Sequence, residues 1–298
     1  MPSQSVSKPV YLHYTQEELD RCYDQRVWAP NAAAVIARYD EESARARAAL
    51  RHHADVPYGA HPAQRLDLFP PGGAGAPVHL HLHGGAWRAL DKEDVSFVAP
   101  PLVATGALVV IPGFSNLPEV RLPDIVAQLR EAVAWVWNHV ADHGGDRDRI
   151  TISGHSSGAH LAAVLLTTDW EPFGLPDDVL KGGFCLSGSY DLGPVMLSSR
   201  RLYIDIDAQE EQQLSPLLHV ERLRCPVIVG LGEGESPEFR RQGAAFATAV
   251  ERSGGRLARL ECAGLNHFEV ALELADARTP ASTALEGLVH GAFREKRA

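Results

Sequence analysis

The sequence contains few cysteines: there are four in 298 residues, and none lies close to another in the chain. No two of them form a C-x-x-C pair. The last three lie inside apolar runs that are typical of strands, where an unpaired cysteine behaves as a small apolar side chain. We therefore expect buried free thiols at these positions, which are Cys22, Cys185, Cys225 and Cys262.

Long apolar runs and blocks of positive charge are also missing. Nowhere do about 18 uncharged apolar residues follow one another, as a membrane helix requires, and the N-terminal stretch has no apolar signal core. The formal net charge is −10, whereas nucleic acids and anionic membranes attract clustered Lys and Arg. We expect a cytoplasmic protein with neither a nucleic-acid nor a membrane partner.

Apolar residues, in contrast, are abundant. Hydrophobic residues make up 45% of the chain, which is long enough to bury a large core. We find no internal repeat and no linker long enough to divide the chain, so we expect one globular unit with an N-terminal helical arm at 1–54 and an α/β domain at 55–298. The arm reads as two helical pieces within 16–51, broken at Pro30. It should pack over the domain or form part of the substrate access wall.

Strand and helix patterns alternate through the rest of the chain. This alternation predicts a mostly parallel sheet with helices on both faces, preceded by two short antiparallel strands at 55–59 and 64–70. A helical insertion is expected near 191–221, where a cap over a site would fall. The other expected strands are 78–85, 107–113, 149–153, 181–188, 226–232 and 256–264, and the main expected helices are 92–106, 124–140, 236–254 and 283–296.

The pentapeptide Gly154-His155-Ser156-Ser157-Gly158 lies between a β-branched stretch and a helical pattern. In this setting G-x-S-x-G describes a nucleophile elbow, a tight turn that needs glycine two residues on either side of the serine. Ser156 is therefore the candidate nucleophile, and Ser157 fails the same test. The alternative interpretation is an ordinary glycine-serine turn, which is common in α/β proteins.

A second motif, His83-Gly84-Gly85-Ala86-Trp87, follows directly after an expected strand. Acyl transfer places negative charge on a carbonyl oxygen, and fixed backbone N–H groups stabilise that charge. We predict that Gly84 and Gly85 supply such donors, together with the N–H of Ser157.

Three histidines of the same strand, His79, His81 and His83, fall on one face and raise the alternative of a metal site. No H-E-x-x-H motif and no carboxylate at ligand spacing accompanies them, so we predict no metal. The run after Gly230 resembles a dinucleotide fingerprint, but Glu235 stands where a glycine is needed, and we predict no cofactor.

A third stretch, Gly264 to Glu269, follows the last expected strand and contains His267, the candidate general base. The orienting carboxylate should follow the preceding strand, where Glu233, Glu235 and Glu238 are available. We favour Glu235, because Glu238 falls in the first turn of a helix and is already explained by the helix dipole. Glu233 and Asp191 remain alternatives.

Five motifs in the same order resemble the kynurenine formamidase (arylformamidase) family of α/β-hydrolases: HGGAW, LPEVRLPDIVAQL, GHSSGAHLAA, SGSYDL and ESPEFRRQ. The resemblance covers about residues 55 to 270. It implies an α/β-hydrolase fold and hydrolysis of a small aryl formamide or ester through an acyl-enzyme, with Ser156, His267 and Glu235 as the triad. Relatives commonly have alanine at the position of Ser157 and aspartate at the position of Glu235.

Four aromatic residues near these motifs are expected to wall a flat substrate pocket: Trp87, Phe114, Tyr190 and Phe268. A carboxylesterase for small esters is the alternative enzyme, and a catalytically inactive hydrolase fold that only binds is the alternative from another class. The sequence does not decide between a monomer and a homodimer.

Overall fold

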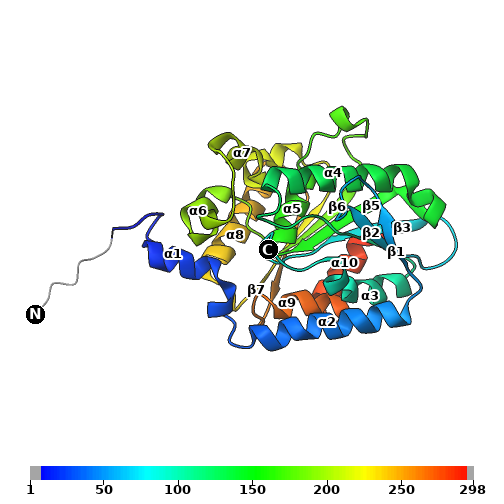
Figure 1. Cartoon of the computed structure of the whole chain (residues 1–298), viewed down its shortest axis with the longest axis horizontal. Coiled ribbons are helices and arrows are strands. Elements are labelled where there is room, and N and C mark those ends of the chain that lie inside the picture. The colour runs from blue at the N-terminus through cyan, green and yellow to red at the C-terminus, as the bar shows by residue number, and fades with distance from the viewer. Residues whose placement is uncertain (1–7, 294–298) are drawn as a thin grey trace, which may run out of the picture.

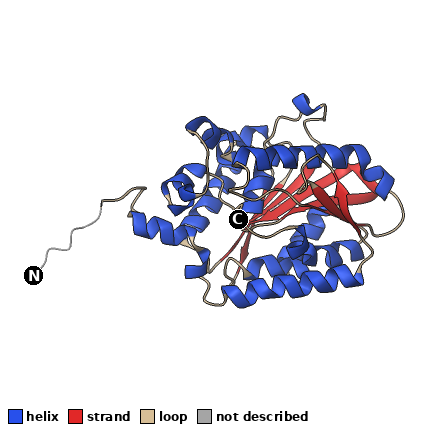
Figure 2. Cartoon of the chain, in the orientation of Figure 1, coloured by secondary structure: helices blue, strands red, loops and turns tan. Residues whose placement is uncertain are grey.

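The computed structural model describes residues 8–293, and within this range eight strands form one sheet (Figures 1 and 2). Its strand order is β1-β2-β4-β3-β5-β6-β7-β8. The first two pairings, β1 with β2 and β2 with β4, are antiparallel, and the other five are parallel. The strands are β1 His53–Pro57, β2 Arg65–Phe69, β3 Ala76–Leu82, β4 Leu108–Pro112, β5 Gly145–His155, β6 Leu180–Leu186, β7 Val227–Gly232 and β8 Leu257–Cys262.

Helices cover both faces of the sheet, which gives three layers (Figure 1). One face carries α4 (Leu122–His139), α5 (Ser157–Leu166) and α8 (Pro237–Arg252). The other carries α2 (Ala32–Ala49), α3 (Ala99–Ala104), α9 (Glu269–Leu272) and α10 (Pro280–Val289). The predicted mostly parallel sheet with helices on both faces is thereby confirmed.

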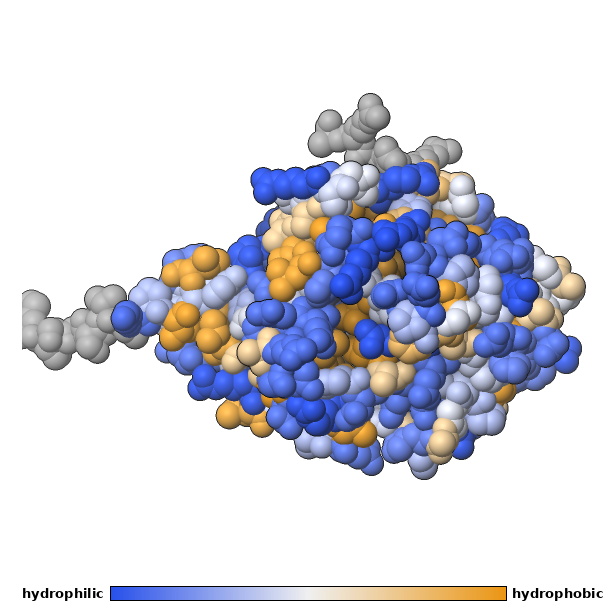
Figure 3. Space-filling view, turned by 90° about the horizontal axis from the view of Figure 1, so that it is seen from above, coloured by the Kyte–Doolittle hydropathy of each residue, from blue (hydrophilic) through white to orange (hydrophobic). Residues whose placement is uncertain are grey.

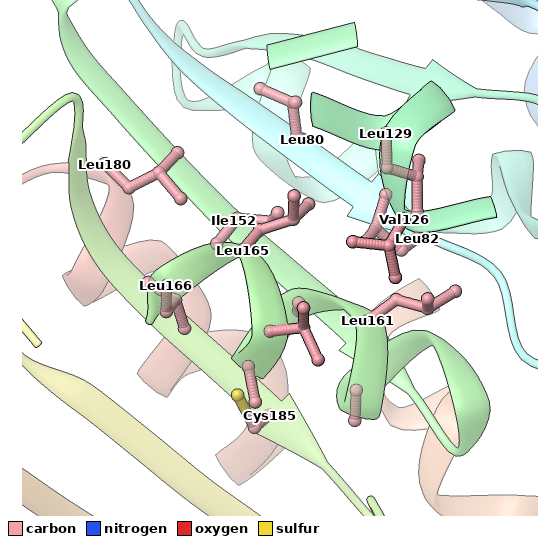
Figure 4. Packing of buried hydrophobic residues seen from close by; sticks show 14 of the residues in the cluster. Leu80, Leu82, Val126, Leu129, Ile152, Leu161, Leu165, Leu166, Leu180 and Cys185 are labelled. Carbon is pink, nitrogen blue, oxygen red and sulfur yellow. The ribbon is translucent and has the colours of Figure 1, made fainter. Parts of the chain in front are cut away.

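The packing between α4, α5 and the centre of the sheet explains why these segments form the core (Figure 4). Apolar residues recur three and four positions apart along α4, so one stripe of the helix faces the sheet. Val126 and Leu129 of this stripe lie near Leu82 of β3, and Leu165 of α5 lies against Ile152 of β5 (Figure 4). All of these side chains are almost completely buried.

The helical arm differs from its prediction at one point. Its first helix, α1 (Gln16–Tyr23), begins at Thr15 with a capping box, but it ends one turn before the predicted Trp28. Asp24 takes an extended conformation there, and its carboxylate accepts a hydrogen bond from Arg26 N–H to start a separate 3₁₀ turn, η1 (Gln25–Val27).

Between β6 and β7 the chain forms a series of short helices at the predicted place of the insertion. They are α6 (Leu192–Leu197), η5 (Ser199–Leu202), α7 (Ala208–Gln213) and η6 (Pro216–Arg222). Two 3₁₀ segments, η2 (Lys92–Val98) and η3 (Val140–His143), flank α3 and α4. The predicted closing helix at 283–296 ends at Val289, and its last three residues lie outside the described range.

The surface is polar over most of the face seen in Figure 3, with apolar residues in smaller patches between charged ones. Within residues 8–293, no helix has both the length and the apolar character needed to cross a bilayer. All four cysteines are free thiols; three are buried and Cys225 is partly buried.

Candidate active site

The turn between β5 and α5 has the geometry of a nucleophile elbow. Ser156 adopts φ 57° and ψ −121°, a conformation that costs energy for a residue with a side chain. A Cβ atom at Gly154 would lie 2.2 Å from Gly158 O, and one at Gly158 would lie 2.2 Å from Leu82 O. Only glycine fits at either position, which is the physical reason for the spacing seen in the sequence.

Ser156, His267 and Glu235 form a continuous line of polar contacts. The Oγ of Ser156 lies 2.9 Å from Nε2 of His267, and Nδ1 of His267 lies 3.4 Å from Oε2 of Glu235. All three side chains are buried, with exposed fractions of 7%, 3% and 4% in the same order. Nδ1 faces the carboxylate, and a ring that carries its proton on Nδ1 leaves Nε2 to accept the serine proton.

The carboxylate of Glu235 is itself held in place from the other side. Its Oε1 accepts hydrogen bonds from the hydroxyl of Ser187 and from Gly232 N–H, the latter at 2.8 Å. Ser187 follows β6 and has a positive φ of 62°. Its part in holding Glu235 was not predicted from the sequence, where the run from 187 to 192 entered only as one of the family motifs.

The alternative carboxylates have other partners. Glu233 accepts a hydrogen bond from Gly264 N–H at 2.8 Å, and Asp191 caps α6 through Gly193 N–H at 3.0 Å. Glu238 is buried in a two-bond ion pair with Arg241. Of the candidate acids within the described residues, only Glu235 contacts His267.

His155, the residue before the serine, also belongs to the site, although its position in the motif gave no signal of this. Its Nε2–H donates to the backbone oxygen of His267 at 2.7 Å, and the two rings lie 4.7 Å apart. Burial holds the pKa of His155 well below its ordinary value, so the ring stays neutral and keeps this bond. The elbow thus fixes both Ser156 and the backbone of His267.

The loop after β3 approaches the elbow closely. Gly85, Ala86 and Trp87 all have positive φ values, and a Cβ atom at Gly85 would lie 1.9 Å from Ala89 O. Gly85 and Ala86 line the cavity beside Ser156. Gly84 does not line the cavity and lies against the backbone of His155. Ala86, which the sequence did not single out, is therefore a further residue beside Ser156.

The side chain of Ser157 joins this loop to the elbow: its Oγ accepts a hydrogen bond from Trp87 N–H at 3.1 Å. The backbone N–H of Ser157 opens α5, where the first amides have no partner inside the helix. An alanine at this position would keep the backbone donor and lose the link to Trp87.

Two of the three strand histidines, His79 and His81, form a buried polar network with neighbouring hydroxyl groups, whereas His83 contacts the backbone oxygen of Gly84 at 2.9 Å. His79 contacts Thr151 and Ser153 at 2.9 and 2.6 Å, and His81 contacts Ser153 at 2.8 Å. Burial lowers the pKa of His81 to about 3 and that of His83 to about 4. Within residues 8–293, no three His, Cys, Asp or Glu side chains gather as metal ligands.

A cavity of about 400 Å³ opens in front of Ser156 and His267. One side of it is formed by the elbow and the loop after β3. The opposite side comes from the arm and from the insertion, which contribute Tyr23, Asp24, Gln25, Arg26, Ile36, Tyr39, Ser199, Arg200 and Tyr203. Phe268 lines the cavity as predicted.

The other three aromatic residues predicted for the pocket do not line this cavity, and their contacts explain why. Trp87 turns its indole N–H toward His160 Nδ1, at 3.2 Å. Phe114 stacks on His83 with ring centroids 4.0 Å apart, and Tyr190 stacks on Phe246 at 4.2 Å. These rings belong to the core.

Similarity to known proteins shows to which structural class this chain belongs. A solved structure from Silicibacter sp. TM1040, provisionally described as a thioesterase, matches with a TM-score of 0.79 at 27% identity, over 92% of this chain and 99% of that chain. The family model described as BD-FAE matches residues 66–173. Together with the sheet order and the elbow, these findings define an α/β-hydrolase.

Two curated relatives narrow the class. The kynurenine formamidase of Danio rerio is 30% identical over 275 residues, which cover 88% of this chain and 92% of the relative. The esterase LipQ of Mycobacterium tuberculosis is 30% identical over 246 residues, or 74% of this chain and 57% of that protein. The chain belongs to the kynurenine formamidase family, and it is a serine hydrolase of small-molecule amides or esters.

Proposed function

We propose that this protein is an arylformamidase, which removes the formyl group from an aromatic amine by way of a formyl-enzyme. The observation that carries the proposal is the match to a kynurenine formamidase over 88% of the chain, combined with the contacts of Ser156, His267 and Glu235 at one cavity. The aromatic side chains of Tyr39 and Phe268 in that cavity suit a flat leaving group.

In the proposed mechanism, Nε2 of His267 takes the proton of Ser156 as the Oγ attacks the formyl carbon. The neighbouring Glu235 carboxylate stabilises the imidazolium that forms. The carbonyl oxygen becomes negatively charged and accepts hydrogen bonds from the backbone amides of Gly85 and Ser157. Gly84, the third donor expected from the sequence, does not line the cavity. His267 then returns the proton to the leaving amine.

Water completes the cycle in the second half of the reaction. His267 removes a proton from water as its oxygen attacks the formyl-enzyme carbon, and the Ser156 oxygen leaves with the proton that His267 returns. The products are formate and an aromatic amine. The backbone of His267 stays fixed by His155 throughout, so the ring can serve both half-reactions.

A carboxylesterase acting on small esters is the second candidate, because LipQ matches 74% of the chain at the same 30% identity. Both activities use the same proposed triad and differ in the leaving group. When an amide is cleaved, the amine leaves only once its nitrogen is protonated. Amide cleavage therefore requires that His267 can reach that nitrogen, whereas ester cleavage places no such demand on a nitrogen.

Two measurements test the proposal. A fluorophosphonate probe should label the protein at Ser156, and a failure to label would support the inactive binding fold. N-formyl-L-kynurenine, N-formylaniline and 4-nitrophenyl acetate should then be compared by kcat/KM. We expect a measurable kcat/KM for the N-formyl compounds. Hydrolysis of the ester alone would favour the esterase.

The finer features of the proposal are a cytoplasmic enzyme and an aromatic substrate from tryptophan breakdown. The four free thiols are typical of a reducing compartment. Whether the enzyme works as a monomer or a homodimer is decided by sedimentation at the concentration of the activity assay.

A further inference from the structure

Arg200, in the 3₁₀ segment η5 of the insertion, lines the cavity in front of Ser156 although only 8% of the residue is exposed. Its guanidinium carbon lies 5.5 Å from the ring centroids of Tyr23 and Trp87 and 5.9 Å from that of Phe239. The Phe239 ring in turn lies 5.0 Å from the ring of His267. One aromatic ring therefore separates this cation from the proposed base.

The guanidinium has more donors than partners. An arginine side chain carries five N–H groups, and the structure assigns one hydrogen bond to this one, from Nη2 to the backbone oxygen of Tyr23 at 2.8 Å. Arg200 lines the cavity, and none of its other side-chain nitrogens donates a hydrogen bond to another residue within 8–293.

Within residues 8–293, no carboxylate forms an ion pair with Arg200. Glu238, which contacts Tyr23 from the other side, is engaged by Arg241 at 2.7 and 2.8 Å. Asp24, at the cavity wall, accepts a hydrogen bond from Arg26 N–H. A buried charge without a counter-ion is costly, and a bound anion would remove that cost.

The charged residues that line the cavity carry a net positive charge, as Arg200 does. Arg26, Arg88 and Arg200 line it against a single acid, Asp24, in a chain whose formal net charge is −10. Arg88 stacks on Tyr203 at 4.4 Å near the same wall. A positive cavity in an acidic protein attracts anionic ligands selectively.

We propose that Arg200 binds a carboxylate on the leaving group of the substrate and so selects anionic aromatic substrates over neutral ones. A carboxylate suits the remaining nitrogens of a guanidinium because the two groups pair through parallel hydrogen bonds. The inference rests on the proposed function only in taking Ser156 as the reacting atom, and it does not depend on whether the bond cleaved is an amide or an ester.

The alternative role for Arg200 is purely structural: it would hold Tyr23 and fill the space between three aromatic rings. A structural role affects all substrates in the same proportion, whereas a recognition role changes their ratio. The decisive readout is therefore a ratio of two matched substrates measured on the same preparation.

The matched pairs are the 3- and 4-isomers of acetoxybenzoate and acetoxybenzamide, which share the acetyl group and differ in the charge of the leaving phenol. Each kcat/KM is divided by the rate constant for hydroxide hydrolysis of the same ester. We expect the wild-type protein to prefer the carboxylate tenfold or more in at least one isomer pair, mainly through KM. Arg200→Gln should reduce that ratio to near one, and Arg200→Lys should keep part of it.

Arg201→Gln is the matched control, since Arg201 is the exposed neighbour in the same segment and does not line the cavity. It should leave the ratio unchanged. A wild-type ratio near one in both isomer pairs overturns the proposal, even if Arg200→Gln fails to fold. An equal loss on both substrates in Arg200→Gln also overturns it. Failure of the catalytic proposal looks different, because neither ester is then hydrolysed and the fluorophosphonate probe does not react.

Discussion

The two sides of the cavity are held together in different ways. The side with Ser156, the proposed nucleophile, is built from strands in parallel register, and Leu82 of β3 pairs directly with Gly154 ahead of the elbow. The opposite side consists of the arm and the insertion, which are joined to the catalytic loops by individual side-chain hydrogen bonds. Gln25 bonds to Ser236, and Tyr39 bonds to the backbone oxygen of Phe268 at 2.5 Å.

We propose that this difference separates the chemistry, on the sheet side, from the selection of substrate, on the side of the arm and insertion. The sheet side cannot move without breaking a ladder of backbone bonds, so it keeps Ser156 and His267 in fixed relation. The arm and insertion pack against the domain through side chains rather than through a backbone ladder, and we expect their lining residues to change without disturbing that relation. We therefore expect changes on the sheet side to lower kcat and changes on the arm side to alter KM.

The largest effect is expected on the sheet side, from Ser156→Ala. Loss of the nucleophile should lower kcat by about 10⁴ to 10⁶, while the fold is kept, because alanine adds no atom to the elbow. Steady-state kinetics and intact-protein mass after the fluorophosphonate probe measure this.

Ser199→Ala is the matched control on the insertion side, because Ser199 lines the same cavity. It should stay within a fewfold of wild type and keep full labelling. Labelling that persists in Ser156→Ala and vanishes in Ser157→Ala would show that the elbow has been assigned to the wrong serine.

Next in size is Glu235→Gln, with an expected loss of about 10⁴ in kcat, as in the serine protease template. Oε1 receives two donors, so the amide oxygen of glutamine would take that place and turn its NH₂ toward His267. The ring would then hold its proton on Nε2 and could no longer accept one from serine.

The matched controls are Glu233→Gln and Asp191→Asn, which should keep most of their activity because neither carboxylate contacts His267. Glu235→Asp should be partly active. A Glu235→Gln protein within tenfold of wild type would exclude Glu235 as the orienting acid.

The sheet side is also the part that could be predicted from the sequence. The spacing of Gly154, Ser156 and Gly158 follows from close backbone contacts within one short turn, and such contacts restrict residue type at each position. The alternation of strands and helices likewise depends on neighbours in the chain. The fold and the motif could therefore be read without knowing what packs against them.

The rest of the site depends on contacts between distant segments, for which the sequence holds no local signal. His155 meets His267 across 112 positions, and Ser187 meets Glu235 across 48. Arg200 lies in a short 3₁₀ segment with no motif. The pocket prediction failed for Trp87, Phe114 and Tyr190 for the same reason, since nearness to a motif in sequence does not say which way a ring points.

The third effect is on stability rather than rate, and it again concentrates on the sheet side. Five buried histidines there have lowered pKa values, because burial penalises the charged ring: His79, His81, His83, His155 and His160. The unfolded chain takes up protons below its ordinary histidine pKa of about 6.5 while the folded chain does not. Their stabilising contribution is therefore complete above that pH and is lost as the pH falls.

Each of these histidines should lower the free energy of unfolding by about 1.4 kcal/mol for every pH unit between pH 6.5 and its pKa in the folded protein. Urea unfolding followed by tryptophan fluorescence should show a midpoint that falls steeply from pH 7 to pH 5. His160→Gln should reduce the slope by about one proton, since the pKa of His160 is lowered to about 4. A midpoint independent of pH in this range would contradict the prediction.

On the arm side, Gln25→Ala tests the other half of the comparison. Gln25 is buried and holds both the hydroxyl and the N–H of Ser236, so its loss leaves polar atoms unpaired at a cost of about 1 to 3 kcal/mol. We expect amide exchange in α1 to speed up tenfold or more and KM to rise several-fold, with a smaller change in kcat. Glu17→Gln, exposed on the same helix, is the control and should change neither. A loss confined to kcat would mean that the arm serves the triad rather than the substrate.

The smallest effect is expected where the elbow and the loop after β3 meet. Ser157→Ala removes the acceptor for Trp87 N–H at 3.1 Å but keeps the backbone donor of residue 157. The loop that carries Gly85 then loses one hydrogen bond to the elbow, and a small displacement of the Gly85 amide weakens its interaction with the negatively charged oxygen. We expect kcat to fall about threefold to tenfold, with KM unchanged and a loss of about 1 to 3 kcal/mol in the free energy of unfolding.

Ser253→Ala, a change of the same chemistry at the end of α8 and far from the cavity, should leave both constants as they are. If Ser157→Ala raised KM and left kcat intact, the loop after β3 would act on substrate binding. The assignment of kcat effects to the sheet side and KM effects to the arm side would then be wrong.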